Sequence, residues 1–145
     1  MVDIDVVRIE LVKETTIRYE KQSIKTPEEA VKLMASFFRY ADREKIYVCV
    51  CNTAMHPINI SMVAMGGMKQ CIVSIPEIFK TAILSNCSNI IVFHNHPSGK
   101  VTPSEEDKRI TKRIQQAGQI LDIILQDHII IGEDTFFSFK QAGLL

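Results

Sequence analysis

The amino-acid sequence predicts a single α/β domain built on a mixed β-sheet flanked by helices. Strand-like and helix-like segments alternate along the chain, which has 145 residues, a hydrophobic content of 46% and a net formal charge of zero. A chain of this length and composition can bury a core of its own. We find no internal repeat, low-complexity segment or linker that would divide it.

The chain opens with two apolar, β-branched stretches. Residues 4–12 predict a first strand, and residues 17–24 either pair with it or run as an extended arm. The run from Thr26 to Glu29 then combines an N-cap, a first-turn proline and a capping-box glutamate, and so predicts the start of a helix. Apolar residues recur in it at helical spacing and form a core stripe of Ala30, Met34, Phe37, Phe38 and Ala41.

The middle of the chain predicts three strands and a second helix. The β-branched and aromatic content of residues 46–51 and 58–65 indicates two strands, joined by a turn around residues 56–57. A short strand is expected at residues 70–74. The second helix is expected from about Pro76 to Leu84, where it leads into the next strand.

The last third predicts a buried strand, a third helix and a closing set of strands. Residues 90–93 form an unbroken apolar run, which is typical of a strand buried on both faces. The helix follows Ser104 and is expected to end at Gly118. Its apolar face consists of Ile110, Ile114 and Ala117. The closing strands are expected around residues 122–125, 128–131 and 135–139.

A polar cluster directly follows the buried run. His94 and His96 are two residues apart, so at strand spacing both rings project from one face and can reach one ion. Ser104 and Asp107 follow in the same segment. Zinc in a catalytic site typically takes three protein ligands and leaves a further position to water. His94, His96 and Asp107 supply that number of ligands.

The segment from Ser104 to Asp107 also predicts a simpler structure. It resembles a capping box, with Ser104 as the N-cap and Asp107 as its acidic partner. We favour the metal site because the two histidines stand at the end of a buried strand, before a loop that leads into a helix. Functional residues of α/β sheets gather at such strand ends.

The pattern H-x-H-x(7)-S-x(2)-D resembles the JAMM motif of the MPN/JAB metallopeptidases. It is filled here by His94, His96, Ser104 and Asp107. The RadC-like bacterial branch is resembled in particular by the string from His94 to Gly99, Thr102 and Pro103, Ala117 and Gly118, residues 127–132, and Ser138. The resemblance covers about residues 40 to 145 and implies the MPN architecture, whose sheet is similar to that of cytidine deaminases. One departure is Lys100, where the branch more often has an acidic or small residue; this bears on substrate preference.

The resemblance implies a role for each matched residue. His94, His96 and Asp107 would hold Zn²⁺. Ser104 would orient the water at the metal and stabilise the tetrahedral oxyanion. A glutamate upstream in the chain would serve as the general base.

Three glutamates compete for the role of the base. Glu44 immediately precedes the strand-like run at residues 46–51, which matches the place where the RadC-like branch has an acidic residue, and we favour it. Glu77 is the runner-up, but together with Ser74 it also resembles a capping box. Glu133 lies in a turn, where a solvated acid is expected.

From this resemblance we predict a zinc-dependent hydrolase of the JAMM type that cleaves a peptide or isopeptide bond. The expected partner is a peptide or protein substrate, and the oligomeric state is left open. The residues alone indicate metal-assisted hydrolysis. The alternative is a non-catalytic, metal-stabilised binding module in DNA repair, recombination or mobile-element biology. A Glu44→Gln variant separates the two, because loss of the base abolishes turnover but spares metal binding.

Composition predicts a cytoplasmic protein that does not enter a membrane. The first residues lack the basic start and apolar stretch of a signal peptide, and no apolar run is long enough to span a bilayer. The cysteines contain no C-x-x-C pair, and we interpret them as small buried residues in a reducing compartment. They are Cys49, Cys51, Cys71 and Cys87.

Nucleic-acid binding is weakly supported, although RadC-like proteins have traditionally been described as DNA-repair proteins. The net charge of zero gives no global field that would attract DNA. A local basic cluster would rim the site and consists of Lys100, Lys108, Arg109, Lys112 and Arg113. Longer family members carry an N-terminal segment that resembles a helix-hairpin-helix DNA module, and this chain is too short to include one.

Overall fold

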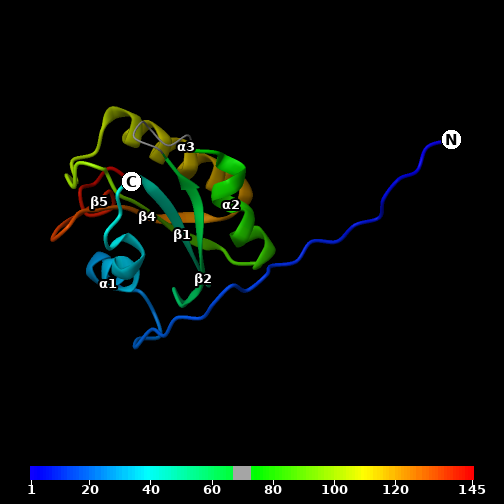
Figure 1. Ribbon diagram of the computed structural model, residues 1–145, viewed down its shortest axis with the longest axis horizontal. Helices are drawn as coiled ribbons and strands as arrows, with labels where there is room; N and C mark the ends of the chain where they lie inside the picture. The colour runs from blue at the N-terminus through cyan, green and yellow to red at the C-terminus, as the bar shows by residue number, and fades with distance from the viewer. Residues whose placement is uncertain (67–72) are drawn as a thin grey trace.

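The computed structural model describes residues 1–66 and 73–145. Within these residues the chain forms three helices and five strands (Figure 1). In chain order they are α1 (Pro27–Phe38), β1 (Lys45–Cys51), β2 (Pro57–Met65), α2 (Ile75–Leu84), β3 (Asn89–His94), α3 (Glu105–Leu121), β4 (Ile124–Ile131) and β5 (Phe136–Ser138). The predicted α/β fold with a mixed sheet is confirmed.

The strands of the described residues form one sheet in the order β2-β1-β3-β4-β5. β1 is antiparallel to both β2 and β3, whereas β3 and β4 are parallel, and β5 is antiparallel to β4. A parallel pair needs a crossover connection, and α3 supplies it. The end of β3 and the start of α3 therefore lie at the same edge of the sheet.

Helices cover both faces of the sheet, with α1 on one side and α2 and α3 on the other (Figure 1). Every residue of β3 is buried, and successive side chains point to opposite faces. Ile91 and Phe93 pack in the core on the α1 side, while Ile90 and Val92 pack in the core on the α2 and α3 side. The same alternation puts His94 on the α3 side.

The first two helices begin where the sequence predicts, but only one has the predicted cap. The Thr26 side chain accepts a hydrogen bond from the Glu29 amide at 3.2 Å, and α1 ends at Phe38, before Ala41. At α2, Ser74 makes no side-chain capping bond, and Glu77 instead forms an ion pair with Lys80. The capping-box prediction for Ser74 and Glu77 is therefore wrong.

The N-terminal strand predicted at residues 4–12 is also wrong. Residues 1–19 form no strand, and their apolar side chains are exposed along an extended segment that leaves the body of the protein (Figure 1). A β-strand is stabilised by a hydrogen-bonded neighbour, and this segment has none in the described part of the chain. Residues 17–24 follow the predicted alternative of an arm. The arm joins the body at buried Ile24, whose amide donates to the Met55 carbonyl at 2.9 Å.

Two further boundaries at the end of the chain differ from the prediction. α3 continues past Gly118 to Leu121 and is capped by Asp122, which has a φ of 57°. Gly118 is needed for a close approach instead, because a Cβ there would lie 2.2 Å from the Ile123 carbonyl oxygen. The strands predicted at 122–125 and 128–131 form one strand, β4.

The short strand predicted at residues 70–74 lies partly outside the described residues. Its last two residues, Val73 and Ser74, are described and are not in a strand.

Candidate metal centre

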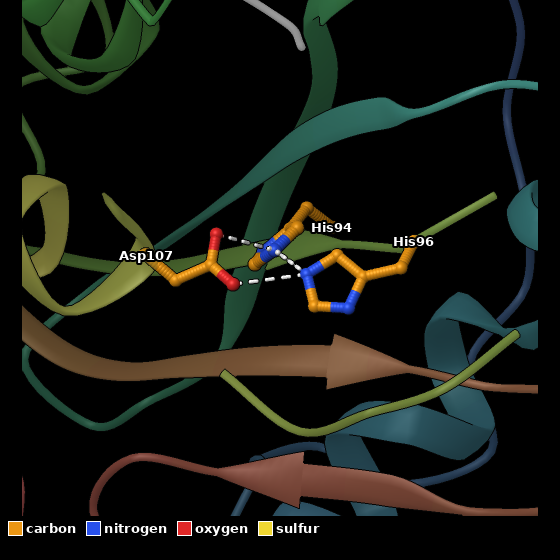
Figure 2. Close-up of side chains that lie close together, drawn as sticks. All are labelled: His94, His96 and Asp107. Carbon is orange, nitrogen blue, oxygen red and sulfur yellow. Dashed lines mark hydrogen bonds and ion pairs between the residues drawn. The ribbon is translucent and has the colours of Figure 1, made fainter. Parts of the chain in front are cut away.

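Three side chains converge at the edge where β3 ends and α3 begins (Figure 2). His94 Nε2 lies 3.3 Å from Asp107 Oδ1, and His96 Nε2 lies 2.9 Å from Asp107 Oδ2. The two Nε2 atoms are 3.1 Å apart. One ligand atom from each residue lies within 4.8 Å of the others, which is the arrangement that a shared metal ion requires.

The two histidines reach this point by different routes. His94 is the last residue of β3, so strand alternation aims it as the sequence predicts. His96 lies beyond the strand, in the loop before α3, and its ring is held by a hydrogen bond between Nδ1 and the Lys100 carbonyl at 2.9 Å. The loop, and not strand spacing, therefore positions His96.

Asp107 is both a capping residue and a candidate ligand. Its Oδ2 accepts from the Ser104 amide at 2.8 Å, and the Ser104 hydroxyl oxygen accepts from the Asp107 amide at 3.0 Å. An ionised carboxylate has about four lone-pair sites, so it can cap a helix and still face two imidazoles. The capping box and the metal site, which the sequence offers as alternatives, are therefore compatible.

The electrostatics of the cluster prepare Asp107 for metal binding. Burial alone would raise its pKa, but the neighbouring His94 and His96 imidazoles outweigh burial and hold the pKa well below its usual range. The carboxyl is thus ionised at neutral pH, as a metal ligand must be. The hydrogen bond to Asp107 also raises the pKa of His96, against the opposing effect of burial.

A further buried histidine supports His94 from behind. His128 Nε2 lies 2.7 Å from His94 Nδ1, and His128 Nδ1 lies 2.6 Å from the hydroxyl of Thr111 on α3. Phe139 stacks on the His128 ring with the planes 7° apart. Burial depresses the pKa of His128 well below its ordinary value, so the ring is neutral.

No role for His128 or Thr111 was predicted from the sequence. The available signal was a histidine directly before the apolar run of residues 129–131, where a buried strand is expected. Which ligand His128 supports depends on the pairing of β3 with β4, in which Val92 is opposite His128 and His94 is opposite Ile130. That register is a tertiary property.

Asp127 faces the other side of β4 and fixes its backbone. Its Oδ1 accepts from the amides of His128 at 2.8 Å and Lys140 at 3.0 Å, and its Oδ2 accepts from the Ser138 hydroxyl at 2.5 Å. Burial raises the pKa of Asp127, partly offset by these bonds. Asp127 and Ser138 therefore hold the strand that carries His128.

Glu44 lines a cavity of about 240 Å³ together with His94 and Asp107. The backbone on both sides of Glu44 is clamped by Asn95, which accepts from the Lys45 amide at 2.8 Å and donates to the Arg43 carbonyl at 3.1 Å. The remaining wall is mostly apolar and consists of Ile46, Val73, Val92, Ile110 and Ile114, with Glu106, Arg113 and His128.

The other glutamates considered as the base lie outside this cavity. Glu77 and Glu133 are exposed, and neither is among the residues that line it. Ser104 is exposed next to Asp107 and is not part of the lining either.

The basic cluster is partly neutralised at the start of α3. Lys108 pairs with Glu105 at 3.2 Å, and Arg109 pairs with Glu106 at 2.9 Å. Arg113 lines the cavity.

The three cysteines that the structure describes play no part in the candidate site. Cys49 and Cys51 are buried on the α1 side with their sulfurs 3.9 Å apart, and Cys87 is partly buried. Cys71 lies outside the described residues. Among the described residues, the triad of His94, His96 and Asp107 is the group with the geometry to hold a metal.

Two imidazole nitrogens and one carboxylate oxygen fit a divalent metal. This donor set suits zinc, and imidazole also suits copper, iron and nickel. The residues present therefore match the ion that the JAMM pattern implies.

Within the described residues, no helix combines the length and the apolar character needed to cross a membrane.

Comparisons with known proteins identify the family of the chain. The family model of the RadC-like JAB domain matches residues 24–144, so the matched region includes α1 and begins before residue 40. A UPF0758 protein of Desulfitobacterium hafniense (strain DSM 10664 / DCB-2) is 41% identical over 122 residues, which cover 84% of this chain and 54% of the relative. A UPF0758 protein of Listeria monocytogenes serovar 1/2a is 38% identical over 137 residues, which cover 93% and 61%. The chain thus spans between 54% and 61% of the length of these two relatives.

Proposed function

The chain belongs to the RadC-like JAB domain family, and on that premise we propose that it is a zinc-dependent hydrolase that cleaves a peptide or isopeptide bond. The observation that carries the proposal is the convergence of His94, His96 and Asp107 beside a cavity that also contains Glu44. When bound, zinc would polarise the scissile carbonyl and lower the pKa of a water molecule toward neutrality.

The three ligands are assigned from their free atoms. His94 and His96 would bind through Nε2, since the Nδ1 atom of each ring already has a partner. Asp107 would bind through a carboxylate oxygen, because its low pKa keeps the group charged at neutral pH. The bond from the Ser104 amide holds that carboxylate in place.

We assign the role of general base to Glu44. A base must come within hydrogen-bond reach of the proton that it removes, and Glu44 shares a cavity with two of the ligands. Its backbone is fixed by Asn95 on both sides and by the Gly66 amide, which donates to the Glu44 carbonyl at 2.8 Å. Asn95, between the two histidines, thus couples the base to the metal site.

Ser104 is assigned to the oxyanion. In the capping box its oxygen only accepts, so its own hydrogen remains available for donation. A donor at this position can stabilise the negative charge that develops on the carbonyl oxygen during attack. The cap and the catalytic role therefore use different parts of one hydroxyl group.

We place this activity in the cytoplasm, with a peptide or protein as the substrate. The sulfurs of Cys49 and Cys51 lie 3.9 Å apart without a disulfide bond, and free thiols suit a reducing compartment. The ion pairs of Lys108 and Arg109 with glutamates reduce the charge that these residues offer to a nucleic acid.

A Glu44→Gln variant tests the proposal. The zinc-loaded protein is incubated with a peptide library and with isopeptide-linked substrates, and cleavage is followed by mass spectrometry. We expect wild-type turnover, and a loss of about 10²-fold to 10⁴-fold in the variant with zinc content unchanged. Glu77→Gln is the matched control, since its carboxylate lies outside the cavity.

Two results would contradict the proposal. Full activity in Glu44→Gln would refute the assignment of the base. Zinc binding without cleavage of any substrate by the wild-type protein would favour a metal-stabilised binding module in DNA repair, recombination or mobile-element biology.

A further inference from the structure

We propose that Thr111 and His128 are positioning residues that keep the proton of His94 on Nδ1 and so leave its Nε2 lone pair facing Asp107 and His96. The inference rests on the proposed metal site and adds the device that prepares it. A buried chain of hydrogen bonds runs from the main chain of α3 through β4 to the end of β3.

This chain of hydrogen bonds starts at the main-chain carbonyl of Asp107, which has a fixed direction. The Thr111 hydroxyl oxygen lies 2.6 Å from that carbonyl oxygen. Two oxygens this close repel unless a hydrogen lies between them, and a carbonyl can only accept. The single hydroxyl hydrogen of Thr111 is therefore committed to Asp107.

This commitment determines the direction of the next two bonds. Toward His128 the Thr111 oxygen can only accept, so the hydrogen between them at 2.6 Å belongs to Nδ1 of His128. A neutral imidazole carries one N–H, which makes Nε2 of His128 an acceptor. At 2.7 Å from this acceptor, His94 must donate from Nδ1. A neutral His94 then has its lone pair on Nε2.

The surroundings of His128 favour the neutral ring that this direction requires. The side chain is buried, its two nitrogens face Thr111 and His94, and Phe139 stacks on one face. No carboxylate lies within hydrogen-bond distance of the ring among the described residues. A charged imidazolium without such a partner would lose its hydration uncompensated.

The chain of hydrogen bonds links the orientation of the His94 ring to the position of Asp107. Thr111 is one helical turn after Asp107, and it takes its direction from the Asp107 carbonyl. The helix that presents the carboxylate therefore also sets the tautomer of His94. Metal-ligating histidines commonly use a carbonyl or a carboxylate for this purpose, and removing such a partner typically lowers metal affinity 10-fold to 100-fold.

The test compares Thr111→Val with Thr111→Ser. Valine keeps the branched shape but removes the hydroxyl, whereas serine keeps the hydroxyl. The first readout is the protonation of the His94 ring nitrogens in the metal-free protein, measured by long-range ¹H–¹⁵N NMR. The second is the affinity for zinc, measured by competition with a fluorescent chelator.

We expect His94 to be protonated on Nδ1 in the wild-type protein and in Thr111→Ser, and to be a mixture of tautomers in Thr111→Val. Zinc affinity should fall by about 10-fold or more in Thr111→Val and be largely restored in Thr111→Ser. His94 protonated on Nε2 in the wild-type protein, or equal zinc affinity in both variants, would overturn the inference.

The wild-type spectrum alone shows the direction of these hydrogen bonds, so the test remains decisive if Thr111→Val does not fold. The outcomes also separate this inference from the proposed function. A proton on Nδ1 of His94 without zinc binding would refute the metal site and leave the tautomer assignment intact. Zinc binding and turnover with the proton on Nε2 would refute the tautomer assignment and leave the metal site intact.

Discussion

The two histidines of the site are supported in different ways, although they face the same carboxylate. The His94 side chain is 3% exposed and is held by buried His128 of β4, which is held in turn by buried Thr111 of α3. The His96 side chain is 18% exposed and is held by one carbonyl of its own loop. Half of the site is therefore formed by the core itself, and the other half depends on a short loop.

The comparison indicates how such a site divides its tasks. A ligand residue whose side chain is buried in the core keeps its orientation whenever the protein is folded, because moving it would disturb packed neighbours. A ligand on a loop can adjust to the ion and to a substrate with less disturbance of the fold. Changes on the core side should affect stability and metal binding together, and changes on the loop side should affect mainly metal binding.

The largest expected difference is between His94→Ala and His96→Ala in the metal-free protein. His94→Ala leaves a buried void and removes the partner of His128 Nε2, so it should lower the free energy of unfolding by about 3 kcal/mol. His96→Ala removes a partly exposed hydrogen bond and should cost about 1 kcal/mol. Both variants should lose zinc.

Urea unfolding in the presence of a chelator measures both stability values. Equal losses of stability in the two variants would show that the buried and the loop halves do not differ as described. Retention of zinc by either variant would remove that histidine from the ligand set.

A smaller effect is expected from pH, and it should act through His96. Its pKa is raised by the hydrogen bond to Asp107, so its contribution to metal-free stability is complete below the unfolded value of 6.5 and is lost as pH rises through the folded pKa. The lowered pKa of Asp107 gives a contribution that is present above its unfolded value of 3.8 and is lost in acid. The pair is therefore most stabilising between these two unfolded values.

Unfolding of the metal-free protein at a series of pH values, in wild type and in His96→Gln, measures this dependence. Above about pH 6.5 the stability of the wild type should fall toward that of the variant. Parallel curves would contradict the role given to His96. Zinc affinity should change in the opposite sense and weaken by up to about 10-fold per pH unit in acid, because zinc must displace the proton of His96.

The sequence could point to the candidate ligands because their signal is local. His94 ends β3 directly after the apolar run of residues 90–93, and Asp107 has a fixed distance from the helix start at Ser104, so strand alternation and capping are sufficient to place these two residues. The role of His128 was not predictable in this way. It arises from the register between β3 and β4, which are separated in the sequence by a loop and a 17-residue helix.

The errors of the sequence prediction have the same origin. Residues 4–12 have the composition of a strand, but a strand needs a neighbour that local composition cannot supply. Polar Asp127 falls between the strands predicted at residues 122–125 and 128–131, yet β4 runs through it because Ser138 and two backbone amides satisfy the carboxylate. Gly118 suggested a helix end, whereas it allows the returning chain to approach α3.

The most direct test of the metal centre is the zinc content of the purified protein, compared with that of Asp107→Ala. Both proteins are prepared without a chelator or a histidine tag, supplied with zinc, and analysed by inductively coupled plasma mass spectrometry. We predict about one zinc per chain in the wild-type protein and its loss in the variant. A wild-type protein without zinc, or a variant that retains it, would contradict the metal centre and leave Ser104 and Asp107 as a helix cap.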